Sequence, residues 1–228
     1  MLRRQTRRLC IIGSNVKFFT SHGGSGKVVV VSGASSGIGK EISLLYAKQS
    51  ARLILSARRQ EQLESVAASC RAAGAENVEV VICDVSKEVD CKNMIEKAVT
   101  NYGGLDILIL NAGVGQSFFL EAMNPDVNIR QFMDVNYYGC IYPTIAALPY
   151  LQKSTNEGGG KIGVISSVGG LVPFPRQTLY NASKYALFGF FDSLRMELQS
   201  KKSHVNITMV CPGFVEMLVV VWEGMESQ

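Results

Sequence analysis

The feature that most constrains the fold is a regular alternation of two patterns from Lys27 onward. Short apolar runs rich in β-branched residues alternate with stretches whose apolar residues recur at helical spacing. Strands buried on both faces of a parallel sheet have such runs, and alternation with helices indicates repeated βαβ units. The expected strands are residues 28–31, 53–56, 78–83, 105–110, 161–165 and 205–210. We therefore predict an α/β protein with a doubly wound parallel sheet.

Three intervening segments predict helices. Two of them have apolar residues on one side only, which indicates packing against the sheet. These residues are Leu63, Val66, Ala67 and Cys70 in the first and Met94, Ile95 and Ala98 in the second. Residues 127–151 are apolar nearly all round, which predicts a helix buried on several sides and a candidate subunit interface. Pro143 and Pro149 are expected to bend or end it.

Residues 1–26 are expected to form a basic arm and linker in front of a single domain, residues 27–216. Residues 1–40 contain seven Lys or Arg and no Asp or Glu, so the positive charge is confined to one end. This distribution does not indicate a nucleic-acid surface, and no nucleic-acid partner is expected. Three interpretations of the arm stay open: a mitochondrial targeting segment, a peripheral contact with an anionic membrane, or an unstructured tail.

The cysteines and histidines favour an intracellular protein without a structural metal. The six cysteines have no CxxC spacing, and His22 and His204 are the only histidines that could complete a metal site. A glycosylation sequon at Asn181 adjoins Tyr180, a candidate catalytic residue that a glycan would obstruct. Reduced thiols in a cytoplasmic, mitochondrial or membrane-associated protein are therefore expected.

A glycine-rich turn follows the first expected strand. It reads Ser32-Gly33-Ala34-Ser35-Ser36-Gly37-Ile38-Gly39, and a helical pattern begins directly after it. Glycines let the backbone approach a pyrophosphate, and a helix N-terminus offers unpaired N–H groups and the positive end of its dipole. The turn therefore predicts a dinucleotide site with contacts from Gly33, Ser35, Ser36, Gly37, Ile38 and Gly39.

The same stretch formally matches the GxSxG nucleophile turn of α/β-hydrolases, with Ser35 as the nucleophile. That turn needs earlier strands to supply an oxyanion hole, whereas Ser35 follows the first expected strand. His204 is the only downstream histidine that could act as the base. The hydrolase interpretation is therefore rejected.

Two arginines after the second expected strand bear on the choice of cofactor. An NAD-specific domain places a carboxylate there to bind the ribose 2′-hydroxyl, whereas arginine binds a 2′-phosphate. The chain has Arg58 and Arg59 at this position, so NADP(H) is the predicted cofactor, with Arg58 as the first candidate for the phosphate ligand. The alternative is that both arginines are exposed and cap the start of the next helix.

Tyr180 and Lys184 are the candidates for acid–base chemistry. They are four residues apart in a helical pattern that continues to about Gln199, so they share one face of that helix. A nearby ammonium favours the phenolate form of a tyrosine, which makes proton transfer feasible near neutral pH. Ser167 follows the fifth expected strand, thirteen residues before Tyr180, and is placed to hold a substrate carbonyl oxygen.

Taken in order, these motifs resemble the single-domain short-chain dehydrogenase/reductase family over residues 27 to about 216. The matching residues are Ser32-Gly33-x3-Gly37-Ile38-Gly39, Asn111-Ala112-Gly113, Ser167, Tyr180-x3-Lys184 and Pro212-Gly213. The resemblance implies a three-layer Rossmann-like fold with strand order 3-2-1-4-5-6. It implies a catalytic role for Asn136, which would support a water that relays protons through the lysine. It also implies cofactor contacts from Asp84, Val85, Asn111, Ala112, Gly113, Tyr180, Lys184, Pro212, Gly213 and Val215.

The chain departs from the family pattern after Pro212-Gly213. Family members continue with a helical segment and a seventh strand, whereas here a short tail, residues 217–228, follows. The seventh strand is expected to be missing or replaced, and the apolar tail either pairs as a substitute edge strand or forms an exposed patch. Val215 stands near the place where the family commonly has a nicotinamide-binding threonine. Two hypotheses follow: an active NADP(H)-dependent reductase, or a truncated protein that binds NADP(H) but catalyses weakly.

Residues 55–59 and 190–195 look most like animal reductases of lipophilic ketones. This resemblance implies a small lipophilic carbonyl or alcohol as the substrate, with steroids, retinoids and other lipids as candidates. Family members form dimers and tetramers, so a homodimer or homotetramer is expected.

Overall fold

The structure, a computed structural model, describes residues 9–11, 24–155 and 158–213. Within these ranges seven strands form one sheet, in which all neighbouring strands are parallel. They are β1 (Leu9–Ile11), β2 (Val28–Ser32), β3 (Arg52–Ala57), β4 (Asn77–Ile82), β5 (Ile107–Leu110), β6 (Lys161–Ile165) and β7 (Asn206–Cys211). Their order across the sheet is β1-β7-β6-β5-β2-β3-β4. Strands β2 to β7 therefore follow the predicted 3-2-1-4-5-6 order, and the α/β doubly wound fold is confirmed.

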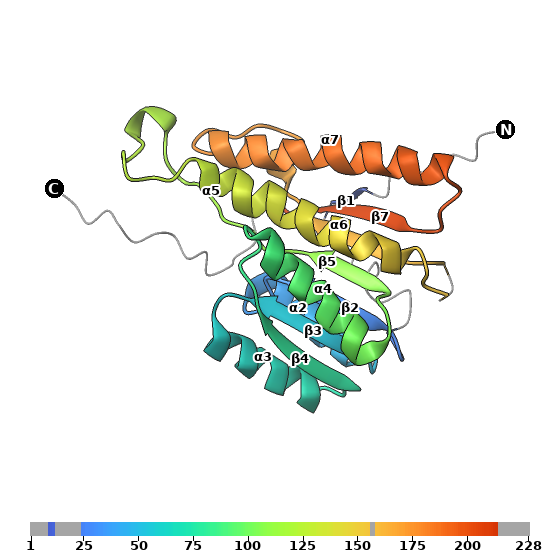
Figure 1. Ribbon diagram of the computed structural model, residues 1–228. Coiled ribbons are helices and arrows are strands. Elements are labelled where there is room, and N and C mark those ends of the chain that lie inside the picture. The colour runs from blue at the N-terminus through green and yellow to red at the C-terminus, as the bar shows by residue number, and fades with distance from the viewer. Residues whose placement is uncertain (1–8, 12–23, 156–157, 214–228) are drawn as a thin grey trace.

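Helices cover both faces of the sheet and make three layers (Figure 1). They are α2 (Gly37–Ala47), α3 (Gln60–Ala72), α4 (Glu88–Tyr102), α5 (Arg130–Met133), α6 (Gly139–Leu151) and α7 (Thr178–Ser200). Shorter segments are η1 (Leu120–Ala122), the π-helical η2 (Asp134–Tyr138) and η3 (Val168–Gly170). Helices α2 and α3 pack on one face, and α4, α6 and α7 pack on the other. Among the described helices, none has the length and apolar character needed to cross a membrane.

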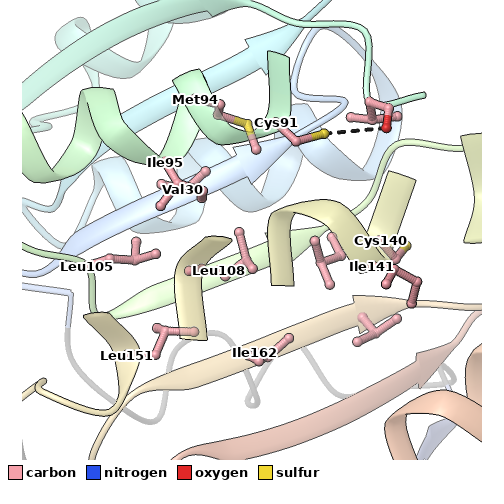
Figure 2. Close-up of a cluster of buried hydrophobic side chains, with 14 of the residues drawn as sticks. Val30, Cys91, Met94, Ile95, Leu105, Leu108, Cys140, Ile141, Leu151 and Ile162 are labelled. Atoms are coloured by element: carbon pink, nitrogen blue, oxygen red, sulfur yellow. Dashed lines mark hydrogen bonds between the residues drawn. The ribbon is translucent and has the colours of Figure 1, made fainter. Parts of the chain in front are cut away.

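The central strand β2 contributes to the core on both faces. Val28 and Val30 belong to the core with α4, α6 and α7, whereas Val29 and Val31 belong to the core with α2 and α3. This alternation explains why β2 is apolar at successive positions. Figure 2 shows the first core, which includes Val30, Cys91, Met94, Ile95, Leu108, Cys140, Ile141, Leu151 and Ile162. The amphipathic patterns predicted for α3 and α4 are confirmed, because their apolar residues are all buried.

Strand β1 takes the edge position beside β7, with residues 9–11 in parallel register with residues 209–211. Residues 9–11, which the sequence pattern assigns to the basic arm, thus occupy the edge of the sheet in the described part of the chain. That assignment is wrong for residues 9–11, because a three-residue run is too short to show strand periodicity. The open edge of β7 provides the pairing partner that the local sequence does not reveal. The remainder of the arm and the tail lie outside the described residues.

The single long helix expected over residues 127–151 is divided into α5, η2 and α6. Both Pro143 and Pro149 lie inside α6, so neither ends the helix. The N–H that Pro149 lacks would have bonded to the carbonyl of Ile145, and Ile145 is 62% exposed. Water can therefore satisfy that carbonyl. Residues on several sides of α6 are buried, whereas the apolar side chains of Tyr138 and Ile145 are exposed.

Replacing Gly39 with alanine tests the packing that joins α2 to the sheet. An added Cβ would lie 2.4 Å from the Gly33 carbonyl oxygen and 2.5 Å from Asn111 Nδ2. We expect Gly39→Ala to lower the free energy of unfolding by about 1–3 kcal/mol in urea denaturation. Gly104→Ala is the control, because no atom lies within 4 Å of its added carbon. Equal stability of the two variants would contradict this account of the turn.

Candidate active site

The candidate site lies at the carboxyl edge of the sheet, where β2 and β5 are neighbours. The crossover connections leave β2 toward β3 on one side and β5 toward β6 on the other, so a crevice is expected between them. The turn after β2 is built from glycines that no other residue could replace without strain. Gly33 has φ +65°, and an added Cβ would lie 2.8 Å from Ala112 Cα. The predicted glycine turn and the Asn111-Ala112-Gly113 segment are thus brought together.

Asn111 holds this turn to the end of β5. Its Nδ2 donates hydrogen bonds to the carbonyl oxygens of Ser32 at 3.2 Å and Gly33 at 3.0 Å. The backbone N–H groups of Asn111 and Ala112 donate to Ser32 Oγ at 3.0 and 3.3 Å. These contacts hold the glycine backbone in the conformation that a phosphate would meet.

Ser35 and Ser36 lie at the N-terminus of α2, together with Arg59 from the end of β3. Arg59 Nη2 donates to Ser36 Oγ at 2.9 Å and to Ser35 Oγ at 3.2 Å. Ser36 is the N-cap residue of α2, but its side chain makes no capping hydrogen bond. Arg59 is the N-cap residue of α3 and likewise makes no side-chain cap. The helix-capping alternative is therefore not seen for Arg59, and it is Arg59, more than Arg58, that reaches the glycine turn.

Asp84 and Val85 follow β4 at the same edge of the sheet. Burial tends to raise the pKa of Asp84, but hydrogen bonds from the hydroxyl and backbone of Ser86 and the charge of Arg58 lower it below its usual value. Asp84 is therefore an ionised acceptor at neutral pH. Val85 is buried, and Gly139 packs so closely on it that an added Cβ would lie 2.7 Å from Val85 Cγ2.

Ser167 and Tyr180 flank one glycine. Ser167 is the N-cap residue of η3, and its Oγ accepts a hydrogen bond from Gly169 N at 3.0 Å. Ser167 Oγ and Tyr180 Cε1 each lie 3.4 Å from the position of a Cβ on Gly169. A Cβ at residue 169 would touch both groups and would collide with Asn181 Oδ1, which lies 2.5 Å from its position. The structure brings the predicted hydroxyl and phenol together, and the hydroxyl of Ser167 still has its own proton to donate.

Lys184 is buried one helical turn after Tyr180, with 4% of its surface exposed. Its Nζ donates to the carbonyl oxygen of Ile165 at 3.0 Å and lies 5.7 Å from the centroid of the Tyr180 ring. None of the ion pairs between described residues involves Lys184. A buried ammonium without a counter-ion acts strongly on its neighbours, because few solvent dipoles screen it.

Asn136 connects the segment after β5 to α7. It is fully buried in the π-helical η2, and its Oδ1 accepts from Val114 N at 2.7 Å. Its Nδ2 donates to Val114 O and to Ser183 Oγ, both at 3.0 Å, and Ser183 Oγ donates to Tyr180 O at 2.7 Å. The amide of Asn136 thus has protein partners at both its oxygen and its nitrogen.

The last predicted contacts lie after β7. Pro212 is buried, and its carbonyl oxygen accepts from Val168 N at 3.0 Å, which joins the end of β7 to η3. Gly213 is exposed, and Val215 lies outside the described residues. His204 precedes β7 and therefore lies at the edge of the sheet opposite Ser35, which follows β2. This separation agrees with the rejection of the hydrolase interpretation.

Three residues of the site were missed at the level of the sequence. Ser32 could have been found, because it stands directly before the glycine turn. The roles of Ser183 and Gln116 have no local signal, since the bond that joins Ser183 to Asn136 and the bonds that join Gln116 to α7 connect segments far apart in the chain. Only the folded arrangement identifies them.

Comparison with known proteins identifies the family. A family model described as short chain dehydrogenase matches residues 27–223. An 11-beta-hydroxysteroid dehydrogenase from Pinus massoniana is 44% identical over 191 residues, which are 84% of this chain and 52% of that protein. The 11-beta-hydroxysteroid dehydrogenase A of Sesamum indicum is 43% identical over 84% of this chain and 53% of its own length. The chain thus spans about half the length of these curated relatives.

A solved structure supports the same assignment. The crystal structure of a short chain dehydrogenase/reductase from Burkholderia phymatum in complex with NAD has a TM-score of 0.79 and 29% identity. The match covers 86% of this chain and 68% of that one. The two relatives named above are plant proteins, whereas the sequence suggested a likeness to animal reductases. With the Tyr180/Lys184 pair, the glycine turn and the sheet order all in place, the chain belongs to the short-chain dehydrogenase/reductase family.

Proposed function

We propose that this protein is an NADP(H)-dependent oxidoreductase that interconverts a lipophilic ketone or aldehyde and its alcohol. One observation carries the proposal: Ser167, Tyr180 and Lys184 meet at the sheet edge that also holds the glycine turn. A hydrogen-bond donor, a proton donor and a buried cation are the groups that carbonyl reduction requires.

The residues at the turn fit a dinucleotide. A Cβ at Gly33 or Gly39 would collide with the Ala112 backbone, the Asn111 amide or the Gly33 carbonyl, so the glycines fix the path of the turn at the N-terminus of α2. Helix α2 begins without an acidic residue in its first turn and without a side-chain cap, which favours an anion at its N-terminus. Asn111 and Lys184 would face the nicotinamide half, and Asp84 the adenine.

Arg59 supports the choice of NADP(H) over NAD(H). Its guanidinium lies against the hydroxyls of Ser35 and Ser36, where a 2′-phosphate could take two hydroxyls and an arginine as partners. The Burkholderia phymatum relative is in complex with NAD, so the family alone does not decide between the two cofactors. The presence of two arginines and no carboxylate directly after β3 is what favours the phosphate.

The side chains then divide the chemistry. A bound dihydronicotinamide supplies hydride to the carbonyl carbon. Ser167 holds the carbonyl oxygen with the proton that its bond from Gly169 leaves available. Tyr180 donates a proton to that oxygen, and the buried Lys184 ammonium stabilises the phenolate that results. Lys184 Nζ donates one hydrogen bond to the carbonyl oxygen of Ile165. Its two other N–H groups could donate to the cofactor ribose and to a water that relays protons.

The loops around Tyr180 favour a lipophilic substrate. Phe119, Leu120 and Val172 are more than half exposed, and we call them the apolar rim. Arg176 brings the two loops of the rim together, because its guanidinium lies 5.6 Å from the Phe119 ring centroid. The plant relatives named as 11-beta-hydroxysteroid dehydrogenases are consistent with a steroid-sized ketone.

Arg59→Ala tests the cofactor assignment. Loss of a charge-assisted bond to phosphate should weaken NADPH binding about tenfold to a hundredfold and NADH binding by less than about threefold. Both dissociation constants can be measured by nicotinamide fluorescence. Arg58→Ala is the matched comparison: a larger loss there would identify Arg58 as the ligand. An unchanged NADPH-to-NADH ratio in both variants would contradict the assignment.

Tyr180→Phe tests the chemistry. We expect kcat for reduction of an 11-ketosteroid to fall about 10²–10⁴-fold, because the proton donor is lost. The dissociation constant of NADPH should stay within about threefold, since the ring itself is retained. Tyr185→Phe, on the exposed side of the same helix, should change neither kcat nor the dissociation constant of NADPH. If the unmodified protein binds NADPH but reduces no ketone in a panel of steroids and other lipids, the weakly catalytic hypothesis holds instead.

We also propose that α6 and α7 contact a second copy of this chain. The exposed apolar residues here are Tyr138 at the end of η2, Ile145 on α6, and Tyr185 and Met196 on α7. The exposed side of α7 also carries Ala182, Gly189 and Ser193, so a broad uncharged surface results. Small and apolar residues of this kind allow close helix packing between subunits.

Ile145→Glu should convert the expected dimer or tetramer to smaller species, because it buries a charge in the interface. Light scattering after size exclusion gives the mass directly. The control is Val89→Glu, which changes a similarly exposed residue on α4. Identical masses for the wild type and both variants would contradict the interface.

A further inference from the structure

The first turn of α7, which carries Tyr180, has no cap of its own. The N-cap residue is Gln177, whose side chain makes no capping hydrogen bond, and no acidic residue lies in the first turn. The first N–H groups of a helix lack partners within the helix. An uncapped turn frays, and here it would take the phenol of Tyr180 with it.

Gln116 supplies the missing cap from the loop after β5. Its Oε1 accepts hydrogen bonds from Leu179 N at 2.8 Å and from Tyr180 N at 3.2 Å. Its Nε2 donates to Phe118 O at 3.2 Å and to Thr178 Oγ1 at 3.3 Å. The residue is 6% exposed, and both the acceptor and the donor capacity of the amide are used.

Arg176 makes a second connection between the same two segments. Arg176 Nη2 donates to Ser117 O at 2.9 Å, directly beside Gln116. Its backbone has φ +67°, an unfavourable conformation for a residue with a Cβ. The strained turn before α7 is thus held against the loop after β5 at two adjacent residues.

Tyr180 and Lys184 depend unequally on this connection. The backbone N–H of Tyr180 is bonded to Gln116 itself. Lys184 lies one turn further along α7, and its Nζ is held by the carbonyl oxygen of Ile165. Loss of the Gln116 cap would therefore shift the phenol relative to Ser167 and leave the ammonium in place.

We propose that Gln116 is a positioning residue for Tyr180, acting as a long-range cap of the helix that carries it. The effect on turnover rests on the proposed reductase function. The capping of α7 by Gln116 is independent of that function, because hydrogen exchange measures it without any substrate.

The exchange experiment compares the wild type with Gln116→Leu, which removes the acceptor and retains a similar apolar bulk. We expect the amides of Leu179 and Tyr180 to exchange about tenfold faster, as for loss of a helix cap. Amides of α3 should not change. Asn206→Leu is the matched control, because it removes an amide that donates to Gly158 and His204 carbonyls at the opposite sheet edge. Wild-type exchange at Leu179 and Tyr180 in Gln116→Leu would overturn the proposal.

The kinetic experiment separates positioning from a purely structural role. Gln116→Leu should lower kcat about tenfold to a hundredfold, with the dissociation constant of NADPH within about threefold. Gln116→Glu keeps the acceptor for Leu179 N and Tyr180 N but loses the donor to Phe118 O and Thr178 Oγ1, so kcat and exchange should lie between those of the wild type and Gln116→Leu.

Each outcome decides the proposal. Faster exchange with unchanged kcat would overturn the positioning of Tyr180. If Gln116→Leu does not fold, Gln116→Met, which also lacks the acceptor, decides, and wild-type exchange at Leu179 and Tyr180 in that variant would overturn the proposal. If the wild type reduces none of the carbonyls offered, the proposed function fails. The exchange rates of the Leu179 and Tyr180 amides then decide by themselves whether Gln116 caps α7.

Discussion

The functional edge of the protein depends on the close approach of α2 to the ends of β2 and β5. Gly39 lies so near the Gly33 carbonyl and Asn111 Nδ2 that even a methyl group would collide with them. This contact lets one amide, Asn111, hold the turn after β2 and the segment after β5 at once. The contact of α2 with the ends of β2 and β5 therefore fixes the relative positions of the phosphate end and the nicotinamide end of the proposed cofactor site. Groups further along the chain then build on the segment after β5.

Two long-range connections join that segment to α7, the helix that carries the candidate catalytic residues Tyr180 and Lys184. Asn136 pairs with Val114 and reaches Ser183, while Gln116 bonds to the start of α7. Lys184 is buried between them and has no carboxylate partner among the described ion pairs. Burying an ammonium in this way is costly for stability, and such a group is commonly found where its charge is used. Rigidity in the scaffold and reactivity in the site thus come from the same contacts.

Much of the fold was predictable, because strands buried on both faces and amphipathic helices leave different periods in the sequence. The run from Val28 to Val31 predicts a strand buried on both faces, and the spacing of Leu63, Val66, Ala67 and Cys70 predicts the buried side of a helix; both are confirmed. The glycine turn and the Tyr180/Lys184 pair could also be predicted from the sequence, because each depends only on the spacing of residues within one turn or one helix. Strand β1, the division of residues 127–151 and the role of Gln116 were not readable, because each depends on a partner distant in sequence.

The most direct test of the account is a paired titration of the full chain with NADPH and NADH, following nicotinamide fluorescence and the midpoint of thermal unfolding together. Ligands that bind the folded state raise the midpoint in proportion to their occupancy and affinity. The account predicts saturable binding of both dinucleotides, with NADPH the tighter and the more stabilising, because Arg59 lies against the Ser35 and Ser36 hydroxyls. Tighter binding of NADH, or no binding of either dinucleotide to a cooperatively folded protein, would contradict it.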